Sequence, residues 1–176
     1  MKLLLQALAL VTTALGALLV DFNAARGDDP KVLGLRNLEA ARDDKRKFVA
    51  NNANDNGANI PLSLEFVDST HLQFRYQASS SVGRVGQWQK TINPNQRYKI
   101  GIAINTASPG WVELYIDGKQ QVFGDERVKR LTANTFPGRA DPKFGAYRGE
   151  EIDIDTFVYD VQIGENKEDV ARAAGF

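Results

Sequence analysis

A lysine and a tyrosine that could carry out proton transfer lie close together in residues 141–149. In a strand, side chains alternate between two faces, so Lys143 and Tyr147 share one face while Phe144 and Ala146 face the core. A nearby cation favours the phenolate form of a tyrosine, which makes the phenol a better acid and its anion a usable base near neutral pH. The pair therefore indicates acid–base chemistry, and the alternative is an ordinary solvated strand face.

Three other segments carry rows of polar and aromatic side chains. The rows are His71, Gln73, Arg75 and Gln77; Gln87 and Gln89, with Trp88 on the opposite face; and Trp111, Glu113 and Tyr115. Amides and guanidinium groups form paired hydrogen bonds, and aromatic faces stack on apolar surfaces, so such rows suit a sugar chain. A plain solvated sheet face is the alternative for each row.

Alternation of apolar and polar residues predicts the strands that would position these rows. It spans residues 62–67, 71–77, 84–92, 97–105, 111–117, 119–123, 143–148 and 152–163. Turn residues separate the segments, and Asp117-Gly118 is typical of a two-residue hairpin. The pattern predicts an all-β fold, an antiparallel β-sandwich or jelly roll, over residues 60–165.

The flanking segments are different in composition. Residues 1–20 begin with Lys2 and an apolar run, and Ala14-Leu15-Gly16 offers small residues for cleavage, so they are typical of a secretory signal peptide. A membrane anchor is the alternative. Residues 21–59 are polar, with a short N-terminal helix predicted at about residues 37–49, and residues 166–176 form a C-terminal tail.

Composition excludes several kinds of function. The 176 residues have a formal net charge of zero and are 43% hydrophobic, which fits one globular domain. A general nucleic-acid binder would need an excess of basic residues. The absence of cysteine excludes disulfides and thiolate metal sites, and a single histidine, His71, excludes zinc sites that need several imidazoles.

Several motifs together resemble the jelly-roll polysaccharide lyases, with the glucuronan-lyase and heparin-lyase-I-like proteins as the nearest branch. In chain order they are Val85-Gly86-Gln87-Trp88-Gln89, residues 110–118 with their Asp117-Gly118 hairpin, residues 143–149, and a last strand ending in Gly164. The resemblance covers about residues 60–165. It implies a secreted enzyme that cleaves uronic-acid-containing polysaccharide by β-elimination.

The resemblance also implies roles for individual residues. Tyr147 matches the family tyrosine that acts as acid and base, Lys143 matches the lysine of the same motif, and Gln87 matches the glutamine that contacts the carboxylate. The family pattern continues to a histidine where this chain has Gln89, so His71 is the candidate substitute base. The expected substrate-binding residues are Arg75, Gln73, Gln89, Trp111 and Arg148.

Two other functions fit parts of the sequence. A non-catalytic carbohydrate-binding module would keep the groove and lack the base, as Gln89 suggests. Glu151-Ile152-Asp153-Ile154-Asp155 is similar to the catalytic strand of laminarinase-like glycoside hydrolases. Its carboxylates are also the ligands that calcium prefers, although their spacing is not that of an EF-hand. We expect a monomeric, extracellular protein that binds an acidic polysaccharide, glucuronan or similar, with no nucleic acid and no membrane partner after signal removal.

Overall fold

The computed structural model describes residues 18–29, 61–79, 81–124, 127–135 and 158–176. The strands in these parts are β1 (Leu18–Asn23), β2 (Leu62–Phe66), β3 (His71–Tyr76), β4 (Val85–Thr91), β5 (Ile100–Asn105), β6 (Gly110–Ile116), β7 (Lys119–Gln120), β8 (Leu131–Ala133) and β9 (Asp160–Gly164). The helical turns are η1 (Ala24–Arg26), η4 (Lys167–Val170) and α1 (Ala171–Ala174). None of the described helices is long and apolar enough to cross a membrane.

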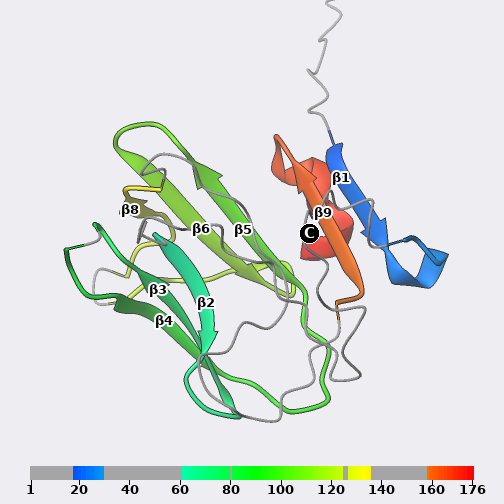
Figure 1. Cartoon of the computed structure of the whole chain (residues 1–176), viewed down its shortest axis with the longest axis horizontal. Coiled ribbons are helices and arrows are strands. Elements are labelled where there is room, and N and C mark those ends of the chain that lie inside the picture. Colours follow the sequence, from blue (N-terminus) through cyan, green and yellow to red (C-terminus); the bar gives the residue numbers. More distant parts are fainter. Residues whose placement is uncertain (1–17, 30–60, 80, 125–126, 136–157) are drawn as a thin grey trace, which may run out of the picture.

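The strands form three antiparallel sheets, which confirms the all-β prediction. One sheet has the order β2-β3-β4, the second has the order β5-β6-β7 with β8 also paired to β6, and the third is the pair β1-β9. Figure 1 shows the first two sheets facing each other, with β1, β9 and α1 beside the edge that β5 forms. The helix predicted at residues 37–49 lies outside the described residues, and the helical turns that are described were not predicted.

The hairpin between β6 and β7 has the predicted two-residue turn. Asp117 and Gly118 have φ values of 50° and 75°, so both lie in the left-handed region that this kind of hairpin requires. Glycine adopts such a φ without steric cost, and aspartate tolerates it better than most residues. The strand after the turn was predicted to run to residue 123, but β7 ends at Gln120.

The core lies between the two larger sheets. Phe74 of β3 is fully buried among residues of the facing sheet and of the segment that follows it, and its ring centroid lies 5.5 Å from that of Phe123. The rest of the buried cluster consists of Val112, Leu114, Ile116, Leu131 and Ala133. The residues of β6 predicted to face the core therefore do so, because alternation places Val112, Leu114 and Ile116 on one face.

The two ends of the described chain meet in the β1-β9 pair. Leu18 is opposite Gly164, and Asp21 bonds to the side chains of Arg26 and Arg172. Residues 18–20, which the sequence analysis assigns to the end of the signal segment, form the start of strand β1 in this sheet, and the boundary of that segment stays a prediction. Residues 1–17, including the expected cleavage sequence, lie outside the described residues.

The predicted C-terminal tail is also part of the fold. Ala174 is buried, and the ring of Phe176 packs edge-on against Tyr115 with 4.7 Å between centroids. Gly118 donates its backbone N–H to the carbonyl of Ala174. The helical turns therefore cover one end of the sheet that contains β5 and β6.

Replacing Phe74 by alanine tests the shared core. We expect Phe74→Ala to lower the free energy of unfolding by about 3–5 kcal/mol, because it removes a fully buried ring and leaves a cavity. Phe66→Ala on the neighbouring strand is the matched control, since that side chain is 47% exposed and its loss should cost far less. Urea unfolding of the three proteins measures the difference, and equal losses for the two variants would contradict the placement of the core.

Candidate functional site

The polar row of β3 faces away from the core, as predicted. Leu72 and Phe74 are buried, and His71, Gln73 and Arg75, which alternate with them, are half-buried. Gln73 is opposite Gln89 of β4 in the antiparallel register. The burial of the apolar residues therefore turns these two glutamines to the same outer face of the sheet.

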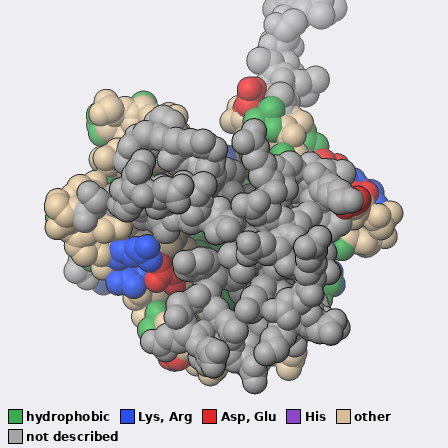
Figure 2. Space-filling view, in the orientation of Figure 1, with side chains coloured by type: hydrophobic (Ala, Val, Ile, Leu, Met, Phe, Trp, Pro, Cys, Tyr) green, Lys and Arg blue, Asp and Glu red, His purple; other side chains and the backbone are tan. Residues whose placement is uncertain are grey.

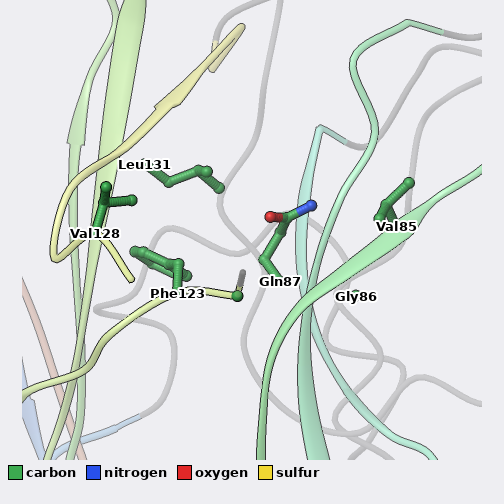
Figure 3. A pocket seen from close by; sticks show the side chains of 7 residues that line it. Val85, Gly86, Gln87, Phe123, Val128 and Leu131 are labelled. Carbon is green, nitrogen blue, oxygen red and sulfur yellow. The ribbon is translucent and has the colours of Figure 1, made fainter. Parts of the chain in front are cut away.

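A β-bulge changes the position of Gln87. Phe74 is opposite Trp88 and Arg75 is opposite Gly86, so Gln87 is the extra residue between these two pairs. Gln87 was predicted to share a row with Gln89, but simple alternation does not hold across a bulge. Figure 3 shows the Gln87 side chain reaching into the space between β4 and the core residues Phe123 and Leu131.

Two adjoining hollows lie along the edge of β4. One has a volume of about 240 Å³ and is lined by Val85, Gly86, Gln87, Phe123, Gly124, Val128 and Leu131. The other has a volume of about 330 Å³ and is lined by Gln73, Gly86, Gln87, Trp88, Gln89, Val122 and Gly124. Gly124 donates its backbone N–H to the carbonyl of Gln87 over 2.6 Å, which holds the following segment against β4. We call the larger one the glutamine hollow.

The amides of the glutamine hollow are available for a ligand. Within the described residues, no hydrogen bond is made by the side chains of Gln73, Gln87 or Gln89. The other described glutamines all have protein partners for their side chains; they are Gln77, Gln96, Gln120, Gln121 and Gln162. An amide has two donor hydrogens and an acceptor oxygen, so these three residues, which all line the glutamine hollow, have free hydrogen-bonding capacity.

Arg75, the predicted partner of a substrate carboxylate, is already paired with a carboxylate of the protein. Its Nη1 lies 3.2 Å from Oε2 of Glu65, and the other oxygen of Glu65 lies 2.6 Å from Nη1 of Arg84. Burial raises the pKa of Glu65, but hydrogen bonds from Ser63 and Arg75 and the charge of Arg84 outweigh it, so the pKa is lowered overall. On the face shown in Figure 2, described basic side chains likewise lie beside acidic ones.

His71, the candidate base, is held by the turn that precedes it. Its Nδ1 lies 2.7 Å from Oδ2 of Asp68, and Asp68 also accepts the backbone N–H groups of Thr70 and His71. The backbone hydrogen bond from Thr70 is the largest influence on Asp68 and, with the bond to His71, lowers its pKa to about 2. The ring therefore stabilises a turn, and it does not line either hollow.

The row of Trp111, Glu113 and Tyr115 lies on the other sheet and is largely covered. Glu113 and Tyr115 are buried, and the Tyr115 hydroxyl donates to Glu113 over 2.5 Å. The guanidinium of Arg130 bonds to Glu113 and stacks 3.9 Å from the centre of the Trp111 ring. Trp111 was predicted to bind substrate, but Arg130 occupies a face of its ring and the glutamine hollow lies elsewhere.

The remaining predicted site residues lie outside the described residues. They are Tyr147, Lys143 and Arg148, together with the acidic run at residues 151–155. The described parts of the chain contain no group of three or more acidic or histidine side chains arranged to hold a metal ion.

Comparisons with known proteins give no family and no function for this chain. No family model matches the chain, and neither a curated protein nor a solved structure matches it.

Sequence reasoning missed three participants near the site. Glu65 and Arg84 flank Arg75, and Gly86 lines both hollows. The alternation of β2 contains a signal for Glu65, because that residue falls on the same face as the row of β3. No pattern identifies Gly86, since its importance depends on how β3 and β4 are paired.

The buried carboxylate of Glu113 predicts a pH dependence of stability. Burial raises its pKa, but hydrogen bonds from Tyr115 and Arg130 lower it more, so the folded-state pKa lies below the usual value of 4.5. This contribution to stability is present above the unfolded-state pKa and is lost as the pH falls through the folded-state pKa. We therefore expect Glu113→Gln to flatten the loss of stability on acidification.

Urea unfolding between about pH 3 and pH 7 measures this dependence. Glu168→Gln, which changes an exposed carboxylate in η4, is the control and should leave the profile close to that of the wild type. An unchanged acid profile in Glu113→Gln would contradict the role given to the Glu113–Tyr115–Arg130 contacts.

Proposed function

We propose that this chain is a secreted polysaccharide lyase with a jelly-roll fold that binds an acidic polysaccharide along the glutamine hollow. The observation that carries the proposal is that three glutamine side chains at this hollow have no hydrogen-bond partner within the described residues. Gln73, Gln87 and Gln89 line one hollow and, within the described residues, make no hydrogen bond to the protein, whereas the other described glutamines do. Gln87 is also the residue that the family resemblance assigns to the substrate carboxylate.

The shape and chemistry of the hollow support binding of sugars. Its volume of about 330 Å³ is at the lower end of the range typical of small-molecule sites. Amides both donate to and accept from sugar hydroxyls, and the apolar residues Trp88 and Val122 also belong to the lining of the hollow. A long chain of sugars could pass along the outer face of the β2-β3-β4 sheet, past the row that begins at His71.

The proposed reaction is an elimination at a uronate residue. A base removes the proton at C5, the electron pair forms a double bond between C4 and C5, and the bond from C4 to the glycosidic oxygen breaks. The departing oxygen then takes a proton from an acid. By the resemblance, Tyr147 supplies this proton transfer beside Lys143, and hydrogen bonds from Gln87 to the carboxylate stabilise the charge that develops when C5 is deprotonated.

A non-catalytic carbohydrate-binding module is the second candidate, and specific contacts favour it. Arg75 is paired with Glu65, and His71 is paired with Asp68. Neither residue is therefore free for the role that the lyase proposal gives it, which is substrate binding for Arg75 and proton abstraction for His71. The glutamine hollow does not depend on these two residues, so binding would persist without catalysis.

Measurement of product and of binding separates the two candidates. We expect wild-type protein mixed with glucuronan, alginate, pectate or heparin to produce an ultraviolet-absorbing unsaturated uronate from at least one of them. Tyr147→Phe should abolish the product and retain binding, because it removes only the hydroxyl. Tyr159→Phe is the matched control, since it makes the same substitution in a tyrosine that is 42% exposed and keeps the ring that Arg97 stacks on.

Three outcomes would count against the lyase. Binding without any unsaturated product would favour the module, and full activity in Tyr147→Phe would remove that residue from the reaction. Reducing sugar released without unsaturated product, and lost in Glu151→Gln, would favour a glycoside hydrolase.

A further inference from the structure

The β4 strand contains a glycine at a place where its backbone does not require one. Gly86 lies opposite Arg75 in the sheet and is not among the described glycines with a positive φ. Glycine weakens a strand interior, so its presence there often marks the close approach of another group. The neighbours of Gly86 identify that group.

The side chain that approaches Gly86 is Gln73. A Cβ atom placed on Gly86 would lie 2.6 Å from Nε2 of Gln73, closer than real Cβ atoms come to other heavy atoms, and 3.0 Å from Cδ, which is tighter than most real contacts. Its three nearest atoms all belong to this one side chain. The amide end of Gln73 therefore lies over β4 in the space that any other residue at position 86 would fill.

We propose that Gly86 is a positioning residue that allows the Gln73 amide to lie across β4 on the floor of the glutamine hollow. Both residues line that hollow, and Gln87 and Gln89 lie on the same strand as Gly86. A methyl group at position 86 displaces the end of a flexible side chain and leaves the backbone in place. Substitution of Gly86 therefore weakens ligand binding much more than it weakens the fold.

This inference rests on the proposed polysaccharide binding, and a double-mutant cycle tests it. The probe is an oligomer of glucuronic acid, and its binding is measured by calorimetry for wild type, Gly86→Ala, Gln73→Ala and the double variant. We expect each single variant to weaken binding roughly three- to tenfold, as loss of a typical hydrogen bond does. In the Gln73→Ala background, Gly86→Ala should change the affinity less than about twofold, because the displaced amide is already absent.

Gly83→Ala is the matched control. A Cβ atom on Gly83 would meet nothing within 4 Å, and this glycine also lacks a positive φ, so the substitution should leave binding and melting temperature unchanged.

The double variant also covers the case in which Gly86→Ala fails to fold. If the double variant folds where Gly86→Ala does not, the result supports the contact between position 86 and Gln73. Failure of the double variant to fold overturns the proposal, because strain elsewhere would then require the glycine.

The outcomes distinguish this inference from the proposed function. If the wild type binds and Gly86→Ala binds equally well, the positioning role is overturned while the function stands. The same holds if Gly86→Ala weakens binding equally with and without Gln73. If the wild type binds none of the oligouronate, the proposed function and this inference are both overturned.

Discussion

The insertion of Phe74 between the two larger sheets is the interaction on which the rest of the structure depends. It belongs to one buried cluster with residues of β6 and β8, and its ring centroid lies 5.5 Å from that of Phe123. Because β3 alternates, burial of Phe74 forces Gln73 and Arg75 to the outer face. The apolar core and the polar row are therefore two consequences of one register, and a shift by one residue would exchange them.

The bulge in β4 gives the site its asymmetry. Without it, Gln87 and Gln89 would lie on one face, as period-two alternation predicts. With it, Gln89 stays opposite Gln73, Gln87 turns toward the space beside Phe123, and Gly86 lies where the Gln73 amide crosses the strand. Bulges often occur at functional sites because they redirect one side chain without unfolding the sheet. The charged residues near the hollow are less available to a ligand than the three glutamines, because Arg75 and Arg84 both pair with the carboxylate of Glu65.

Sequence patterns predicted the parts of the fold that depend on neighbouring residues. Alternation placed Val112, Leu114 and Ile116 in the core, and Asp117-Gly118 identified the hairpin. The parts that depend on distant pairing could not be predicted. The bulge at Gln87 is defined only by its partner strand, and the Arg75–Glu65 pair depends on the β2-β3 register. Glu113 and Tyr115 are covered by Arg130, Lys167 and Phe176, which alternation within β6 cannot foresee.

The central claim is that Gln73, Gln87 and Gln89 act together as the sugar-binding surface. The most direct test is a titration with an oligouronate followed by the side-chain amide signals of the glutamines in nuclear magnetic resonance spectra. The account predicts that the signals of these three residues shift along one common saturation curve, while those of Gln77 and Gln162, which are bonded within the protein, stay in place. Shifts confined to the bonded glutamines, or no shift in the three of the hollow, would contradict it.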